Sequence, residues 1–479
     1  MTSASFYGAP FLSKETKGLS EPRGPKALEL ATKRSAKTRD EIAASIPQWE
    51  SWRRQAEEIK AYAIAHLEQL LVQFERAITA RGAKVLWAES AKEANQLVLD
   101  IAKKHSVRLV VKSKSMVSEE MELNHALAEM KVQSVETDLG EFLVQLAGQR
   151  PTHIVTPALH LSAEDVGRLF AEKLGEPFTR EHEQLTAIAR RHLRQKFLEA
   201  GMGVSGVNFA IADVGALCIV ENEGNAGLSM ATPPVHVALM GMEKVIPTLS
   251  HLPVFLQLLA RSGTGQKLTA YTHLIFGPSP GQSLYVVIVD NGRSRVVADP
   301  HLRSALYCIR CGACLNACPV YRRVGGWAYG WIYPGPIGSV ITPGLVGLKQ
   351  AGKLPFASSL CGACHEVCPV RIDLPHKLVY LRHQAVRKPS PVRSWVERMV
   401  WWGWSVAMSR GWLYRIAMAA GRLGLRLAPL LPWKPRLLRA WLRDRDLPPL
   451  PPAGAFRKRW KELEPELAPQ KSTSADKEQ

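Results

Sequence analysis

Cysteine is scarce over most of this chain of 479 residues. Seven of the eight cysteines lie between Cys308 and Cys368, and the remaining one, Cys218, lies in the apolar segment ALCIV. The first residues, MTSASFYGAPFLSKETKG, include no apolar segment of the kind that directs export. These features exclude a disulfide-stapled secreted domain, and we expect a cytoplasmic protein in which Cys218 is a buried thiol.

Nucleotide-binding motifs and long apolar runs are also absent. The sequence has no P-loop and no G-x-G-x-x-G after a predicted strand, so no nucleotide, flavin or nicotinamide site is predicted. The longest uncharged stretch, 324–348, has ten Gly or Pro among its 25 residues. That composition would break a membrane-spanning helix, so we expect a loop that folds around the cysteine-rich segment and keeps water from it.

The cysteines that are present form two runs, and each run ends in Cys-Pro. The first reads CIRCGACLNACPV and has the C-x2-C-x2-C-x3-C-P spacing of a bacterial iron–sulfur run. The second reads SSLCGACHEVCPV and matches it from the Cys-Pro end, with Ser358 in place of a first cysteine. Zinc sites have no use for crowded runs of four and three cysteines, so iron–sulfur clusters are predicted.

The spacing predicts two clusters, each of which takes one cysteine ligand from the end of the other cluster's run. Two-residue gaps direct three thiolates at one cluster, whereas the three-residue gap and the proline carry the fourth thiolate toward the other cluster. Cluster one takes Cys308, Cys311, Cys314 and Cys368. Cluster two takes Cys318, Cys361 and Cys364. We predict two [4Fe-4S] clusters, with [3Fe-4S] as the alternative for the second, and the fourth ligand of cluster two is open between Ser358, water and a partner's group.

Composition divides the chain into five parts. These are a basic N-terminal arm (1–45), an α/β domain with an N-terminal helix (46–298), a small α-helical two-cluster ferredoxin-like module (299–385), a Trp/Arg-rich helical region (386–446) and a disordered tail (447–479). The net charge is +19, and residues 381–446 hold 14 Lys or Arg against 3 Asp or Glu.

The basic segment has two interpretations. It suits docking on the cluster module or on a companion subunit, with Arg stems packed along apolar faces. It also suits peripheral contact with the inner face of an anionic membrane through 390–446, because Trp and Arg together are typical of a membrane–water interface. No RNA-binding signature accompanies it, so nucleic acid is not an expected partner.

Short apolar runs alternate with helical patterns in the second part. The predicted strands are 84–88, 108–113, 134–138, 153–158, 208–215, 216–224, 236–243 and 285–292. The predicted helices are 47–81, 91–104, 119–129, 141–147, 163–174 and 185–200. This alternation predicts an α/β fold with a largely parallel sheet, to which the closely spaced later strands add antiparallel pairs.

Polar side chains gather where several predicted strands end. VKSKSM carries Lys112, ETDLGEF carries Glu136 and Glu141, and a third group lies in ENEGNA. Because ligands bind at the carboxyl ends of parallel strands, these loops could hold a phosphate or carboxylate. The alternative, which we favour, is that they are turn formers and helix caps. His153 and His160 have no third ligand nearby and are expected to be core or pocket residues.

Many uncommon strings occur in a fixed order along the chain. They are VKSKSM, ETDLGEFLVQLAG, HIVTPALH, NFAIADVGALCIVENEGNA, MGMEKV, LLARSGTGQK, VDNGRS, CIRCGACLNACPVYR, YPGPIG and SSLCGACHEVCPV. Over roughly residues 45–380 the chain thereby resembles the lactate utilization protein B family. The resemblance implies a CoA-transferase/ribose-phosphate-isomerase-like α/β domain followed by a two-cluster ferredoxin-like module. It also implies seven cysteine ligands, which carry over onto the seven cysteines assigned above, with the serine expected in the second run.

The same resemblance implies a subunit of an L-lactate-oxidising system that acts with companion lactate-utilization subunits. We therefore predict an iron–sulfur electron-transfer subunit that relays electrons from oxidation of L-lactate to pyruvate, through two clusters, to an unidentified acceptor. The alternative is that the α/β domain itself binds and oxidises lactate, for which the sequence offers no hydride acceptor. No catalytic residue is predicted.

Overall fold

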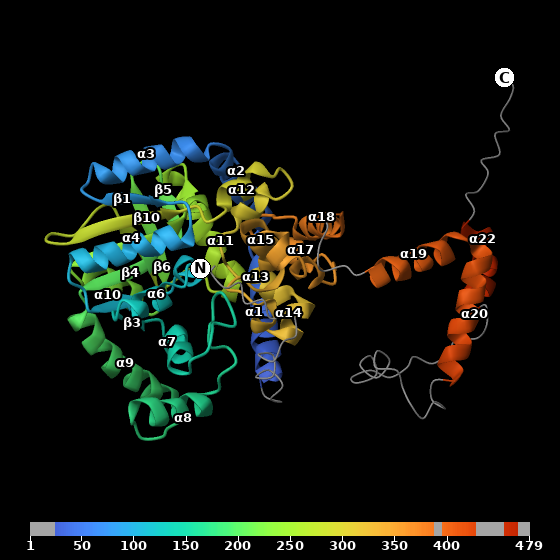
Figure 1. The fold of residues 1–479 in the computed structure, drawn as a ribbon, viewed down its shortest axis with the longest axis horizontal. Coiled ribbons are helices and arrows are strands. Elements are labelled where there is room, and N and C mark those ends of the chain that lie inside the picture. The colour runs from blue at the N-terminus through green and yellow to red at the C-terminus, as the bar shows by residue number, and fades with distance from the viewer. Residues whose placement is uncertain (1–23, 388–394, 428–454, 468–479) are drawn as a thin grey trace. The chain divides into compact units, whose positions relative to one another are not determined.

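The computed structural model describes residues 24–387, 395–427 and 455–467. The chain divides into two compact units, of which the first ends at Val392 and the second begins at Arg393. The first unit holds both the α/β domain and the cysteine runs, and Figure 1 shows its two sheets and the helices packed around them.

A parallel sheet of six strands forms the centre of the first unit (Figure 1). In spatial order its strands are β1 (Lys84–Ala88), β10 (Ser283–Val289), β7 (Val235–Gly241), β4 (Met202–Gly206), β2 (Leu109–Lys112) and β3 (Gln133–Glu136). Every pair in this sheet is parallel, which confirms the predicted α/β class. The carboxyl ends of all six strands therefore meet at one edge of the sheet.

A second sheet of four strands contains the antiparallel pairs. Its order is β8 (Val245–Ile246), β5 (Phe209–Ile211), β6 (Ala216–Glu221) and β9 (Tyr271–Ile275). Strand β6 is antiparallel to both of its neighbours, whereas β5 and β8 are parallel. The antiparallel part expected from the closely spaced later strands is confirmed.

Strand β7 shows how the sheet is joined to the cysteine runs. Val237 and Leu239 face the core that α4 (Ala91–Lys104) covers, whereas Ala238 and Met240 face a core that continues into the cysteine module. Successive strand residues point to opposite faces, so a strand with apolar residues on both faces is buried on both sides. The predicted parts 46–298 and 299–385 therefore share one hydrophobic core.

Helices connect the strands of the first unit. They are α4, α5 (Met116–Glu120), α6 (Leu123–Glu129), α7 (Leu139–Leu146), α8 (Ala163–Leu174), α9 (His182–Glu199), α10 (Asn225–Ala231), α11 (Leu252–Thr264) and α12 (Arg293–Ala298). The predicted bounds of α4 and α8 are those observed. Both begin with a serine cap, Ser90 and Ser162, whose hydroxyl accepts the third helical N–H, and this cap is a strong sequence signal.

One predicted strand, 153–158, is wrong. The segment forms turns, because the backbone N–H groups of Val155 and Thr156 donate to Nδ1 of His153, at 3.0 and 3.2 Å. A side chain that bonds to its own backbone competes with strand pairing in this way. Strand β4 was missed, because its sequence MGVSG holds two glycines, which weaken a strand pattern.

The N-terminal segment also differs from its prediction. Residues expected to form a basic arm instead include helix α1 (Gly24–Ala44), which packs against α11 and the cysteine module and buries Leu28 and Thr32. The helical pattern over 47–81 is two helices, α2 (Trp49–Ala65) and α3 (Leu67–Thr79), which are separated at His66.

The cysteine module is helical, as predicted. Its α-helices are α13 (Ala313–Ala317), α14 (Pro319–Val324), α15 (Gly335–Val346), α16 (Leu348–Ala351), α17 (Ala363–Glu366) and α18 (Leu374–Arg387). The stretch 324–348, expected to be a loop, contains α15, which is buried along nearly its whole length. Burial against the module core overrides the low helix propensity of its glycines and prolines.

The second unit contributes α19 (Trp395–Ser409), α20 (Gly411–Leu427) and α22 (Ala455–Leu467). The first two confirm the helical character predicted for this region, and 428–446 lies outside the described residues. The third corrects the prediction of a disordered tail over 447–479, whose other residues are not described. Among the described helices, none combines the length and the apolar composition that a membrane crossing requires.

Candidate iron–sulfur sites

The two cysteine runs have the same backbone conformation. Gly312 and Gly362 have φ of +81° and +89°, a region that glycine enters without strain, and they begin α13 and α17. The residues two positions earlier, Arg310 and Leu360, have φ of 63° and 56°. Each Cys-Gly-Ala-Cys segment therefore forms the same left-handed loop before a short helix.

Ser358 occupies the position in the second run that Cys308 occupies in the first. The backbone N–H of Arg310 donates to Sγ of Cys308 at 3.4 Å, and the N–H of Leu360 donates to Oγ of Ser358 at 3.1 Å. The alignment of the runs from their Cys-Pro ends therefore holds at the level of individual hydrogen bonds.

One cavity brings together four of the cysteines. Its walls include Cys308, Cys311 and Cys314 of the first run and Cys368 of the second. Most of the remaining lining is apolar, namely Ile154, Ile309, Ile337, Val370, Ile372 and Leu374, and the lining also includes the charged residue Arg310. Four convergent thiols in a largely apolar cavity fit an iron–sulfur cluster, whose potential depends on solvent access and nearby charge. We call these four cysteines the first thiol group.

The other three cysteines form the second thiol group. Helix α13, which Cys318 follows, packs against α17, which holds Cys364. Burial, and then the charges of Cys318 and Cys361, raise the pKa of Cys364 to about 12. Burial also raises the pKa of Cys318, and Cys361 adds to that shift. Cys361 is exposed, whereas Cys318 and Cys364 are buried, so this group lies near the surface.

The Cys-Pro pairs have a local structural role. Cys318 is the N-cap of α14, with Pro319 at the first helical position, and the N–H of Tyr321 donates to its Sγ at 3.4 Å. The N–H of Ile372 donates to Sγ of Cys368 at 3.3 Å. Such N–H groups stabilise a thiolate, and hydrogen bonds to ligand sulfurs tune cluster potential.

A buried network of charges lies beside the first thiol group. Arg293 pairs with Glu243 at 2.6 Å and with Glu120 at 2.8 Å, and Arg310 reaches Glu243 at 3.4 Å. The hydroxyl of Tyr333 donates to Glu120 at 2.7 Å. Although burial opposes ionisation, the two arginines lower the pKa of Glu243 to about 2, so the network stays charged.

This network could not be predicted from the sequence. Three of its members lie in the strings that carry the family resemblance, Glu243 in MGMEKV, Arg293 in VDNGRS and Arg310 in CIRCGAC. These strings were the only indication of the network in the sequence. Their spacing does not show that the segment after β7, helix α12 and the first cysteine run meet in space.

The loop 151–162 of the α/β part forms hydrogen bonds with the cysteine module. Nε2 of His153 lies 3.2 Å from Oδ1 of Asn316, and the hydroxyl of Tyr321 donates to the carbonyl of Thr152 at 2.6 Å. Burial, and then the charge of Lys114, lower the pKa of His153 to about 3, so the ring is neutral.

The remaining single residues behave as expected. His153 is buried and His160 is partly buried, and neither joins a group of metal ligands within the described residues. Cys218 is fully buried, and burial raises the pKa of its thiol to about 12. These two histidines and this cysteine are therefore packing residues.

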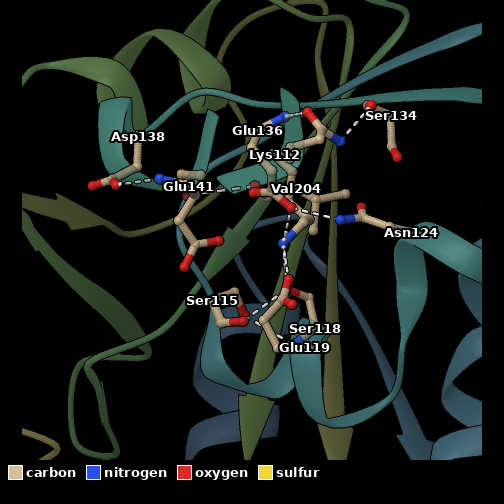
Figure 2. A network of polar contacts seen from close by, with 12 residues as sticks. Lys112, Ser115, Ser118, Glu119, Asn124, Ser134, Glu136, Asp138, Glu141 and Val204 are labelled. Carbon is tan, nitrogen blue, oxygen red and sulfur yellow. Dashed lines mark hydrogen bonds and ion pairs between the residues drawn. The ribbon is translucent and has the colours of Figure 1, made fainter. Parts of the chain in front are cut away.

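Several polar residues at strand ends are caps, as we favoured. Ser115 caps α5, Asp138 caps α7, and the carboxylate of Glu221 accepts the N–H groups of Ala226 and Gly227. The exception is a set of buried charges at the ends of β2 and β3. Figure 2 shows Lys112 and Glu119 there with Glu136 and Glu141.

Three family models match successive parts of the chain. Residues 71–297 match the LUD domain, residues 304–372 match the 4Fe-4S dicluster domain, and residues 381–464 match the C-terminal region of lactate utilisation protein B. A solved DUF162 family protein from Deinococcus radiodurans covers 47% of this chain and 98% of its own length at 13% identity, with a TM-score of 0.26 that supports no argument.

Relatives match most of the chain. A lactate utilization protein B of Bacillus pumilus is 45% identical over 76% of this chain and 78% of its own. That of Oceanobacillus iheyensis is 40% identical over 93% of this chain and 95% of its own. The uncharacterized electron transport protein YkgF of Escherichia coli K12 is 39% identical over 91% of this chain and 94% of its own. With the cysteine runs, these matches show that the chain belongs to the lactate utilization protein B family.

Proposed function

We propose that the two thiol groups bind two iron–sulfur clusters that share ligands across the runs. Cluster one is held by Cys308, Cys311, Cys314 and Cys368, which line one apolar cavity. Cluster two is held by the second thiol group, Cys318, Cys361 and Cys364. The cavity carries this assignment, because it joins Cys368 to cysteines more than fifty positions earlier in the chain, as a shared-ligand arrangement requires.

Iron content tests the assignment directly. Protein purified without oxygen should be brown and carry about eight iron atoms per chain if both clusters are [4Fe-4S]. About seven, with a paramagnetic signal in the oxidised state, would identify a [3Fe-4S] second cluster. Iron near four per chain, or stoichiometric zinc, would contradict the two-cluster assignment.

The clusters make the chain an electron-transfer subunit in oxidation of L-lactate to pyruvate. Lactate oxidation releases two electrons, and iron–sulfur clusters carry one electron each. The chain's own residues position the two sites beside each other, exclude water from the first with apolar side chains, and bring Cys361 of the second to the surface. The names of the relatives, which include lactate utilization and electron transport, support this role.

The decisive experiment is lactate-dependent reduction of the clusters. The chain should co-purify with its companion subunits, and L-lactate should then bleach the visible absorbance of the clusters. The chain alone should not respond. Reduction of the isolated chain by lactate, together with a flavin absorbance, would instead favour the alternative that its α/β domain oxidises lactate.

The second unit supplies a contact surface. Helices α19 and α20 pack on each other, and much of their apolar surface remains exposed. The large exposed side chains of these two helices include Trp395, Trp401, Trp402, Trp404 and Trp412. We propose that this surface docks on a companion subunit. Peripheral membrane contact is the alternative, because Arg410, Arg415 and Arg422 lie close to these tryptophans along the chain.

Flotation with anionic liposomes at low salt separates these alternatives. If the full chain floats and a chain ending at Arg387 does not, the helices bind the membrane. If both stay at the bottom, the surface binds protein, and co-purification with the companions should then be lost in the shorter chain.

A further inference from the structure

Three glutamates converge at the carboxyl ends of β2 and β3, outside the cysteine module. Glu136 ends β3, Glu119 belongs to α5 and Glu141 belongs to α7, and one carboxylate oxygen of each lies within 4.8 Å of the others. In an octahedral magnesium site, oxygens on opposite sides of the ion are about 4.2 Å apart, and around calcium they are about 5 Å apart. The separation therefore suits oxygen ligands of one divalent cation.

Lys112 holds two of these glutamates in place. Its Nζ lies 2.7 Å from Oε1 of Glu136 and 2.8 Å from Oε1 of Glu119, and Figure 2 shows it between them. Nδ2 of Asn124 donates to the same Oε1 of Glu136 at 2.6 Å. Carboxylates that bind metals are commonly oriented by such outer hydrogen bonds.

The other oxygen of Glu136, Oε2, has no hydrogen-bond partner among the described residues. It is buried, and the residue as a whole is only 3% exposed. Leaving a buried polar atom unpaired is destabilising, and more so when it is charged. This atom is an observation independent of the acidic grouping, and it points to a ligand that the protein atoms do not supply.

Acidic side chains outnumber basic ones in this group. Lys112 pairs with two of the three glutamates, and the charge of Lys114 also acts on Glu141. Glu141 is 3% exposed and forms no ion pair within the part of the chain that is described.

We propose that Glu119, Glu136 and Glu141 bind one divalent cation of the magnesium and calcium class. The site lies at the edge of the parallel sheet where such folds bind ligands, and all three side chains offer the hard oxygen ligands that these ions prefer. Lys112 acts as a positioning residue, because its ammonium group binds one oxygen of each of two glutamates. The site is separate from the seven cysteines and needs no iron–sulfur cluster.

Manganese(II) is the probe for this site. Titrated at room temperature into the full chain with its clusters in place, Mn²⁺ should lose its free six-line EPR signal with a stoichiometry of one per chain. Glu141→Gln and Glu119→Gln should each weaken binding at least tenfold, and excess Mg²⁺ or Ca²⁺ should restore the free signal. Glu129→Gln is the matched control, because Glu129 lies nearby on α6 but is exposed.

Each outcome decides the proposal. Binding that weakens in the two site variants and not in the control supports it, provided that their iron content is unchanged. Glu119 is partly exposed, so its variant is expected to fold even if a change at Glu141 prevents folding. The proposal is overturned if the unaltered chain binds no Mn²⁺, or if the site variants bind it as tightly. The glutamates would then balance their charge by holding protons.

Discussion

The two cysteine runs have similar backbone conformations at corresponding positions but lie in different surroundings. In the first, the residue before the Cys-Gly-Ala-Cys loop is Arg310, which is buried against Tyr333 with its guanidinium 4.6 Å from the ring centre. In the second, the corresponding residue is Leu360, next to an exposed Cys361. The first run is surrounded by protein charges, and the second is partly surrounded by solvent.

The comparison shows how a repeated ligand loop yields two unlike sites. Buried positive charge stabilises a reduced cluster, which carries more negative charge, so Arg310 should raise the potential of cluster one. In the proposed assignment, the exposure of Cys361 should give cluster two access to a redox partner. The sequence of the loop sets the ligand geometry, whereas the segments that pack around each loop set its electrostatics.

Removing the cysteine that one run contributes to the cluster of the other run should have the largest effect. Cys368→Ser should remove cluster one although Cys368 belongs to the second run, and Cys318→Ser should remove cluster two. Each should lower iron by about four atoms per chain and delete one set of EPR signals. Cys218→Ser, at a buried thiol outside both groups, should leave iron content unchanged. Loss of the cluster of its own run in each variant would contradict the shared arrangement.

Supplying the missing cysteine should make the two runs alike. Because Oγ of Ser358 accepts the N–H that corresponds to the one at Cys308, Ser358→Cys should place a fourth thiolate on cluster two. We expect full occupancy by four irons and loss of any [3Fe-4S] signal after oxidation, read by EPR and iron analysis. Ser359→Cys is the control, because Ser358, and not Ser359, accepts the N–H of Leu360. Equal effects of both variants would show that Ser358 has no special position.

Removing the charge beside cluster one should have a smaller effect. A unit charge at about 6 Å in an effective dielectric of about 20 contributes about 3 kcal/mol, so Arg310→Gln should lower the potential of cluster one by on the order of 100 mV. Leu360→Arg should raise that of cluster two by much less, because solvent screens a charge near the surface. Redox titration followed by EPR measures both. Shifts of equal size would contradict the difference in burial.

The sequence offered more information on the cysteine ligands than on the electrostatics around them. It allowed Cys368 to be predicted as a ligand of cluster one, because ligand spacing is a local property with a known geometric reason, and Cys368 lines one cavity with the first three cysteines of the first run. The convergence of Glu119 with Glu136 could not be predicted, because it depends on the parallel pairing of β2 and β3. Likewise, the uncharged stretch 324–348 gave no sign of α15, because that helix is stabilised by tertiary burial and not by propensity.

The smallest expected effect is a pH dependence of the contact between the loop 151–162 and the first run. His153 is buried with a pKa of about 3, whereas an exposed histidine has a pKa of about 6.5. The unfolded chain therefore binds a proton that the folded chain does not, so the stabilisation is complete above pH 6.5 and is lost as pH falls toward 3. By pH 5 the loss should be about 2 kcal/mol, or a few degrees in melting temperature. His153→Gln should flatten the melting temperature between pH 5 and 7 relative to the unaltered chain. An unchanged slope in His153→Gln would show that this histidine does not set the acid sensitivity of the contact.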